Sequence, residues 1–165
     1  MAVFKVGGVG RYDPYKSFMF RVRWDLTYVA GVSKMSALRR TTTAVRHRNG
    51  ADPSRDRKSP GVTRYEAVTL QRGITLDTRF EEWASLVHAP GSPIALSRLR
   101  KDLIVDVFNE GGQQVLSYRL NRCWVSEFQT LPQLDAAGAA VAIEMLKVEL
   151  EGWERDTPHV VHAGM

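Results

Sequence analysis

Residues 101–125 read KDLIVDVFNEGGQQVLSYRLNRCWV, and their alternating pattern predicts an antiparallel β-hairpin. The first half places apolar side chains on one face and mainly charged ones on the other. The sequence Asn-Glu-Gly-Gly at 109–112 is typical of a tight turn that reverses the chain. The second half then alternates again. The apolar face comprises Leu103, Val105, Val107, Leu116, Tyr118 and Leu120.

Further strands are predicted on the N-terminal side of this hairpin. Residues 18–25 (FMFRVRWD) place a large apolar residue at every second position, which is typical of a half-buried strand. Residues 26–35 are rich in β-branched and aromatic residues, with Gly31 as a candidate bulge. Residues 62–71 predict another strand.

Between these strands, residues 36–71 predict a long hairpin whose tip leaves the body of the domain. Residues 36–48 (SALRRTTTAVRHR) have strand propensity but no continuous apolar face, so a strand here is exposed on both sides. Asn-Gly, Asp-Pro and Ser-Pro-Gly sequences predict a polar loop over residues 49–61. Loops of this length inside compact domains are usually functional or disordered.

One helix is predicted from residue 78 onward. Thr78 and Glu81 have the spacing of a capping box, and apolar residues follow at helical spacing until Pro90 and Gly91 end the pattern. Residues 139–151 are ambiguous, because their apolar residues fit a helical face and also alternate as in a strand. The pattern alone slightly favours a helix there.

Length and composition bound the class of protein. The 165 residues have room for one domain, and a hydrophobic content of 44% is sufficient for a buried core. A single cysteine, Cys123, excludes an intrachain disulfide framework. No apolar run reaches the length of a membrane span, and residues 1–16 lack the pattern of a signal peptide. These features predict a soluble protein in a reducing compartment.

Charge is distributed unevenly along the chain. The net charge is +5, but residues 34–64 carry nine basic and two acidic residues, a balance of +7. Residues 134–156 carry six acidic and two basic residues, a balance of −4. This asymmetry suits head-to-tail contacts between identical copies, and it also suits simple solubility.

No catalytic or cofactor-binding motif is present. The glycine cluster at 7–10 lacks the Lys-Ser/Thr of a phosphate-binding loop, and His159 and His162 have no companion carboxylate motif. Cys123 is expected to be a small buried side chain. Asp102 and Asp106 are about 13 Å apart on a strand, too far for paired acid–base catalysis. We therefore expect a protein that is not an enzyme and that binds no metal and no cofactor.

A nucleic-acid-binding function is a weaker alternative. The basic segment would neutralise phosphates. However, no aromatic side chain lies between Arg39 and Arg64 to stack on bases.

Several segments together resemble one family. They are DPYKSFMFRVRWD (13–25), VAGVSKMSALRRTT (29–42), RKSPG (57–61), YEAVTLQRGITLDTRFEEWA (65–84), RKDLIVDVFNEGGQQVLSYRLNRCWVSEF (100–128) and VAIEMLKVELEGWER (141–155). In this order they resemble the inner tube proteins of phage-like contractile injection systems, which are related to contractile phage tail tubes and to Hcp.

The resemblance implies a mainly β fold, an antiparallel β-barrel-like sandwich with one α-helix and a long protruding hairpin. It implies a strand rather than a helix at 141–152. The expected organisation is one domain, 1–165, with a flexible N-terminal arm (1–16), a protruding hairpin (36–71) and a C-terminal tail (157–165).

The implied function is that of a structural subunit, assembling into stacked hexameric rings that form a hollow conduit. The expected partners are other copies of the chain, a surrounding sheath protein, baseplate and cap proteins, and cargo in the lumen, with no membrane insertion of the subunit. Cytoplasmic assembly into a phage-like particle is expected. A secreted Hcp-like ring that carries effectors is the alternative within the resemblance.

Assembly residues are predicted from charge and position. The inter-ring arm is expected to use Arg39, Arg40, Arg46, Arg48, Arg55, Arg57 and Lys58. The candidate acidic receiver comprises Asp135, Glu144, Glu149, Glu151 and Glu154. The core is expected to contain Phe18, Phe20, Trp24, Phe80, Trp83, Val105 and Trp124.

Overall fold

Two antiparallel sheets share one long strand, β10 (Gln114–Gln129). The computed structural model describes residues 5–6, 9–10, 19–48, 50–51, 54–88 and 96–156. The first half of β10 pairs with β9 (Lys101–Phe108) on one side and with β12 (Gly152–Asp156) on the other. Its second half pairs with β11 (Ile143–Glu149). The predicted hairpin at 101–125 is confirmed.

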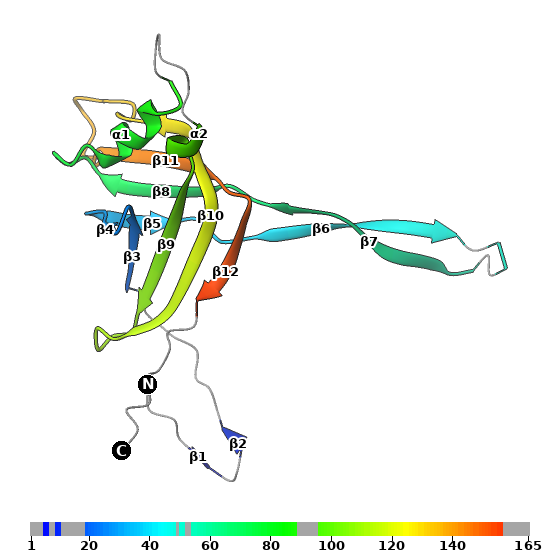
Figure 1. Ribbon diagram of the computed structural model, residues 1–165. Helices are drawn as coiled ribbons and strands as arrows, with labels where there is room; N and C mark the ends of the chain where they lie inside the picture. The colour runs from blue at the N-terminus through cyan, green and yellow to red at the C-terminus, as the bar shows by residue number, and fades with distance from the viewer. Residues whose placement is uncertain are drawn as a thin grey trace.

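Each sheet is completed by strands from the N-terminal half of the chain. Beyond β9 lie β3 (Met19–Trp24) and β4 (Thr27–Tyr28), and together with β10 and β12 they form sheet I. Beyond β11 lie β8 (Val68–Gly73) and β5 (Val32–Met35), which form sheet II with the second half of β10. In Figure 1 the strands of sheet I run across the direction of those of sheet II. This arrangement confirms the mainly β, antiparallel fold class.

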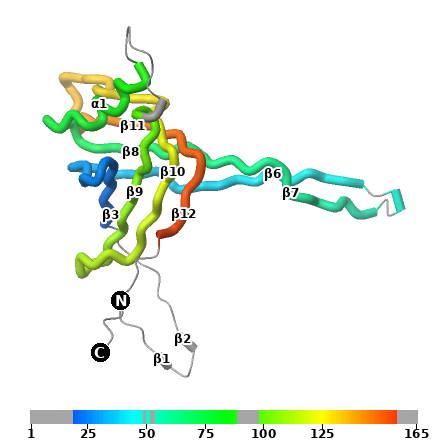
Figure 2. The backbone as a smooth tube through the Cα atoms, viewed as in Figure 1, coloured from blue at the N-terminus to red at the C-terminus, as the bar shows by residue number. Residues whose placement is uncertain are grey.

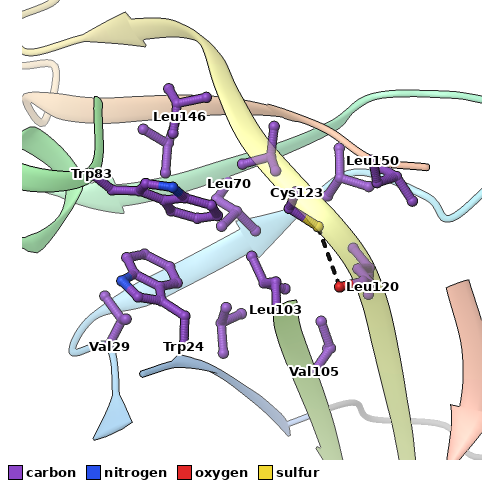
Figure 3. Packing of buried hydrophobic residues seen from close by; sticks show 14 of the residues in the cluster. Trp24, Val29, Leu70, Trp83, Leu103, Val105, Leu120, Cys123, Leu146 and Leu150 are labelled. Carbon is purple, nitrogen blue, oxygen red and sulfur yellow. Dashed lines mark hydrogen bonds between the residues drawn. The ribbon is translucent and has the colours of Figure 1, made fainter. Parts of the chain in front are cut away.

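The core lies between the two sheets and is closed by helix α1 (Arg79–Ser85), which packs against β10. The short helix α2 (Leu96–Leu99) precedes β9. Trp24 and Trp83 meet at the centre with ring centroids 4.7 Å apart (Figure 3). Aliphatic side chains from both sheets surround them, among them Leu70, Leu103, Leu120 and Leu146.

Most of the predicted core is buried, with one correction. Trp24, Phe80, Trp83 and Val105 are buried, Phe20 packs partly buried against them, and Phe18 lies outside the described residues. Trp124 is only half-buried, because the strand bulges before it. The register with β9 shifts between Leu120 and Cys123, and Arg122 has φ +52°. The bulge turns Cys123 and Val125 toward the core, so Trp124 points to the other face.

The helix begins near the predicted place but without the predicted capping box. Asp77 Oδ1, not Thr78, accepts a hydrogen bond from the free backbone N–H of Arg79, at 3.1 Å. The Thr78 hydroxyl instead donates to Glu82 Oε1 at 2.7 Å. The side chains of Phe80 and Trp83 are buried as the helical spacing predicts.

Residues 143–149 form a strand, so the helix favoured by the pattern alone is wrong and the strand implied by the resemblance is confirmed. β11 pairs with β10 on one side and β8 on the other. Burial alternates along it, with Glu144, Leu146 and Val148 inside. Both edges of the strand are thus satisfied by long-range pairing, which overrides the local helix propensity.

A separate two-stranded ribbon projects from the sandwich (Figures 1 and 2). It consists of β6 (Arg40–Arg48) and β7 (Asp56–Tyr65), which pair only with each other in the described part of the chain. We call it the arm. Of the predicted 36–71 hairpin, residues 40–65 form the arm, whereas residues 68–71 belong to β8 of sheet II, which pairs with β5.

The predicted loop over residues 49–61 is wrong in its second half, since the strand resumes at Asp56. Pro60 lies opposite Ala44, where the register shifts. A Cβ at Gly61 would come within 2.9 Å of Val45 and 3.0 Å of the Thr43 carbonyl oxygen. Glycine is therefore required at this bulge.

The predicted terminal segments lie almost wholly outside the described residues. Of residues 1–16, the structure describes only β1 (Lys5–Val6) and β2 (Val9–Gly10), which pair antiparallel. Residues 157–165 are not among the described ones.

Candidate assembly surfaces

The arm has almost no buried surface of its own. Every residue of β6 is exposed, and in β7 only Ser59 and Tyr65 are half-buried. An isolated two-stranded ribbon is at best marginally stable in water. Beyond its base, the arm packs against no other element among the described residues, so its two faces are open to contact with another molecule.

Basic side chains face one another across the arm. Arg46 lies directly opposite Lys58, and His47 lies opposite Arg57. One compensating ion pair joins Arg48 Nε to Asp56 Oδ1 at 3.3 Å. Like charges in cross-strand pairs are destabilising. An acidic surface placed against the arm would relieve this repulsion.

Two of the predicted arm residues are engaged at its base. The Arg39 guanidinium lies 3.6 Å from the Glu66 carboxylate, and the Arg40 guanidinium lies 5.8 Å from the Trp153 ring centroid. The Trp153 ring also meets Tyr65 edge-on at 6.2 Å. Because Trp153 lies on β12, its contacts with Arg40 and Tyr65 anchor the base of the arm to sheet I. The five predicted basic residues of the distal arm are Arg46, Arg48, Arg55, Arg57 and Lys58.

The predicted acidic receiver does not form one surface. Glu144 is 7% exposed and its carboxylate is bonded to Arg72 inside the same chain, so it is not available to a partner. Glu151 pairs with Arg100 and Arg122. The remaining three residues lie in the β10–β11 loop (Asp135), at the end of β11 (Glu149) and on β12 (Glu154).

The outer face of sheet I carries a polar network that the sequence did not reveal. Asp106 is 0% exposed, and its carboxylate accepts four hydrogen bonds. Arg23 Nε and the Tyr28 hydroxyl donate to Oδ2 at 3.0 and 2.8 Å. Ser117 Oγ and Gln114 Nε2 donate to Oδ1 at 2.7 and 3.3 Å. The hydrogen bond to Asp106 raises the pKa of Tyr28.

A second buried network fixes the entry to α1. Arg72 is 0% exposed; its Nε donates to Glu144 Oε2 at 2.8 Å, and its NH2 group donates to the Asp77 carbonyl oxygen. Its guanidinium also lies 4.0 Å from the ring centroid of Phe80. The cation thus joins β8, β11 and the loop before α1 into one rigid unit.

Sheet I has two edges with free backbone groups. β12 pairs only with β10, and β3 pairs with β9 along Met19–Arg23. On the other side of β3, β4 pairs with Arg23 and Trp24 and the Val29 N–H donates to the Val22 carbonyl oxygen at 2.8 Å, so the open part of this edge is residues 19–21. These statements hold for the described part of the chain. Unpaired strand edges are templates for pairing with another chain.

The two edges carry opposite charges on the same face. Arg21 lies opposite Asp106 in the register of β3 and β9, and Asp106 lies opposite Ser117. Ser117 in turn lies opposite Asp156, and Arg119 lies opposite Glu154. The outer face of sheet I therefore presents Arg21 and Arg23 at the β3 edge and Glu154 and Asp156 at the β12 edge.

Possible metal ligands, the single cysteine and the helices bear on whether the part of the chain that the structure describes carries chemistry or spans a membrane. The described residues contain no cluster of three or more His, Cys, Asp or Glu side chains that could hold a metal ion. Cys123 is fully buried, so the small buried side chain predicted from the sequence is confirmed, and burial raises the pKa of its thiol to about 12. Among the residues described, no helix is long and apolar enough to span a membrane.

The sequence from residue 16 to residue 154 matches the family described as T4-like virus tail tube protein gp19. The chain belongs to this tail tube family. The resemblance seen in the sequence is thereby confirmed. No curated protein sequence matches the chain.

Solved structures with the same fold come from contractile injection systems. A chain in the six-fold symmetrised anti-feeding prophage (AFP) baseplate superposes with a TM-score of 0.73 at 17% identity, covering 89% of this chain and 98% of that one. A chain of the PVC sheath–tube complex in its extended state gives 0.72 at 16% identity, covering 87% and 92%. Hcp1 from Flavobacterium johnsoniae is less similar, with a TM-score of 0.55 at 13% identity over 84% and 94% of the two chains.

The sequence of this tail tube family member did not predict that Asp106 and Arg72 are buried at the centres of two hydrogen-bond networks. Asp106 sits at a polar position of an alternating strand, which predicts exposure. Arg72 instead lies in phase with the buried Val68 and Leu70, so the alternation places a charged residue on the inward face without naming its partner. One signal was present for Asp106: its strand neighbours Ser117 and Gln114 are also polar. For Arg72 the partner Glu144 lies 72 residues away, in a segment whose pattern favoured a helix.

Proposed function

We propose that this chain is the structural subunit of the inner tube of a contractile injection system or phage tail. Six copies close into a ring, and rings stack into a rigid hollow conduit. The single observation that carries the proposal is the membership of the tail tube family over residues 16–154. The exposed arm and the open edges of sheet I supply the surfaces that such a polymer needs.

Ring closure uses the two edges of sheet I. The β12 edge of one copy pairs with the β3 edge of the next, which extends sheet I around the ring and removes both exposed edges. Glu154 and Asp156 then approach Arg21 and Arg23 of the neighbour on one face. Because the two edges differ, the contact is heterologous. Such contacts form a closed ring of six copies when each copy is rotated by one sixth of a turn relative to the last.

Stacking of rings uses the arm. Its length carries it away from its own sandwich, and its basic distal half favours an acidic surface on a subunit of the adjacent ring. A stable interface buries about 1,200–2,000 Å² in total, which a projecting ribbon supplies more readily than the body of a small sandwich.

The subunit acts passively. A surrounding sheath contracts and drives the rigid tube forward, cargo travels in the lumen, and baseplate and cap proteins end the tube. The AFP baseplate and the PVC sheath–tube complex contain chains of the same fold, which supports these partners. The subunit makes and breaks no bonds, and we place its assembly in the cytoplasm.

The test removes the distal arm without disturbing the rest. Val45 lies opposite Ser59, so replacing residues 46–58 with Asn-Gly closes a shorter hairpin in the same register. Negative-stain microscopy of the wild-type chain should show rods, and the shortened variant should show rings alone with an unchanged melting temperature. Rods from the shortened variant would contradict the role of the arm.

The same experiment separates the alternatives. Wild-type rings that never grow into rods would favour a secreted Hcp-like ring. A chain that stays monomeric and binds nucleic acid with steep salt dependence would favour the nucleic-acid-binding alternative.

A further inference from the structure

A basic groove opens at one end of sheet I, where β3 ends and β9 begins. Its volume is about 770 Å³, and the end of α1 and helix α2 form its far wall. Five basic side chains line it, against two acidic ones. The basic residues are Arg23, Arg98, Arg100, Lys101 and Arg119.

Part of this positive charge is not neutralised within the chain. Lys101 pairs with Asp25, and Arg100 pairs with Glu151. Arg98 and Arg119 form no ion pair with any residue that the structure describes. The groove therefore favours an anionic group.

An apolar side chain stands at the rim of the groove. Leu26 is 96% exposed, and it follows Asp25 in a turn where both residues have positive φ, +64° and +52°. Residues 25 and 26 form the two-residue loop between the paired Trp24 and Thr27, and a tight hairpin loop of this type requires positive φ at both positions. The loop therefore holds the Leu26 side chain outward in a fixed place. Leu26 thus offers an apolar contact at the rim of a groove in which Arg98 and Arg119 offer charge.

The opposite end of the same hairpin carries a rigid acidic projection. The turn from Asn109 to Gly112 lies at the end of sheet I far from α1 and α2 (Figure 1). The Asn109 side-chain oxygen accepts from the Gln113 backbone N–H at 2.9 Å, and Gly112 N–H donates to the Asn109 carbonyl at 3.0 Å. These bonds hold the turn in one shape with Glu110 exposed at its tip. The eight residues of β9 separate the groove from this turn by about 26 Å.

We propose that the Glu110 turn of one copy docks in the basic groove of the next copy along the tube. The inference rests on the proposed function, since it requires sheet I to run from one ring face to the other. An open polymer needs two different, complementary surfaces, and the β9–β10 hairpin presents an acidic projection at one end and a basic groove at the other. The basic distal arm is repelled by this groove, so the two stacking contacts do not compete.

A crosslinking experiment tests the contact directly. Gly111 lies next to Glu110 and has a negative φ, so a cysteine fits its backbone. The Cβ that Gly111→Cys adds would lie 3.4 Å from the nearest side-chain atom, and Glu110 stays in place. When rods of the variant that combines Gly111→Cys with Leu26→Cys are oxidised, disulfides should join copies in successive rings. Non-reducing gels should then show a ladder of dimers, trimers and longer chains, while rods of either single variant should show only monomers. Native Cys123 is buried and does not interfere.

A charge swap tests the electrostatics. Glu110→Lys should raise the concentration needed for rod growth about tenfold while rings still form, because it places a cation in a basic groove. Arg98→Glu in the same chain should restore growth. The control Glu127→Lys makes the same charge change on the second half of β10 and should leave growth unchanged.

The outcomes separate the two proposals. Wild-type protein that forms no rods under any condition overturns the proposed function together with this contact. Rods that form normally but give no crosslink, and whose growth Glu110→Lys leaves unchanged, overturn the contact alone. Inorganic phosphate that slows rod growth of wild-type protein, but not of the variant that combines Glu110→Lys with Arg98→Glu, supports an anion-binding groove.

Discussion

Arg72 and Glu144 form a buried ion pair between adjacent strands β8 and β11, with Nε 2.8 Å from Oε2 and side chains 0% and 10% exposed. They are directly opposite in the strand register. The same guanidinium reaches Asp77 and the Ala30 carbonyl oxygen. The Arg72 side chain thus connects β8, β11 and the loop that precedes α1.

Replacing this cation should lower the free energy of unfolding substantially. Arg72→Met leaves the Glu144 carboxylate buried without its partner, which typically costs about 3–5 kcal/mol. Urea unfolding followed by tryptophan fluorescence measures the loss. The control is Arg39→Met, which removes an exposed pair with Glu66 and should change stability by less than about 1 kcal/mol. Equal effects of the two variants would contradict this account.

The carboxylate of Asp106 should matter in the same way on sheet I. Asp106→Asn turns an NH₂ group toward some of its four donors and removes the charge facing Arg23, so we expect a loss of about 2–4 kcal/mol. Thermal unfolding measures it. Glu110→Gln, an exposed acid on the adjoining turn, is the control and should shift stability by less than about 0.5 kcal/mol. An Asp106→Asn variant as stable as this control would refute the prediction.

The Cys123 thiol should be unreactive in the folded protein. Burial raises the pKa of this thiol from its ordinary value near 9 to about 12, so the folded state favours the protonated thiol. The stability that this contributes is present below pH 9 and is lost as the pH rises toward 12. Cys123→Ala should therefore flatten the decline in stability between pH 9 and pH 12, measured by urea unfolding at each pH. In wild-type protein a thiol reagent should label Cys123 at pH 8 only after denaturation, and rapid native labelling would contradict its burial.

Charge reversal at the β12 edge should block ring closure. Glu154→Lys with Asp156→Lys places cations against Arg21 and Arg23 of the neighbour, and we expect at least a tenfold weaker association. Light scattering after size exclusion gives the oligomer mass. Adding Arg21→Glu should recover part of the association. Glu127→Lys with Glu149→Lys makes the same net charge change away from this edge and should leave the rings intact; equal loss in both double variants would exclude an edge-specific effect.

Neutralising the distal arm should separate ring formation from stacking. Arg46→Gln with Lys58→Gln removes the repulsion across the arm and also its attraction for an acidic surface. The isolated subunit should be unchanged or slightly more stable, while rods should become rarer and less sensitive to salt. Turbidity and microscopy at several salt concentrations measure this. Rods with unaltered abundance and salt dependence would show that the arm does not dock through these charges.

Local pattern determined much of this protein. The alternation in residues 19–24 and 101–120 specified β3, β9 and β10, because a half-buried strand needs an apolar side chain at every second position. The helical spacing of Phe80 and Trp83 specified α1. The absence of an apolar face in residues 40–48 specified an exposed strand, and that exposure identified the arm.

Only the tertiary structure decided the rest. Whether residues 143–149 form a strand depends on β8 and β10, which lie far away in sequence. The burial of Asp106 depends on donors from three other strands, and that of Arg72 on an acid 72 residues away. A side-chain pattern records which face a residue takes, whereas strand register decides which charges meet across that face. Long-range pairing sets that register, so no local stretch of sequence contains it.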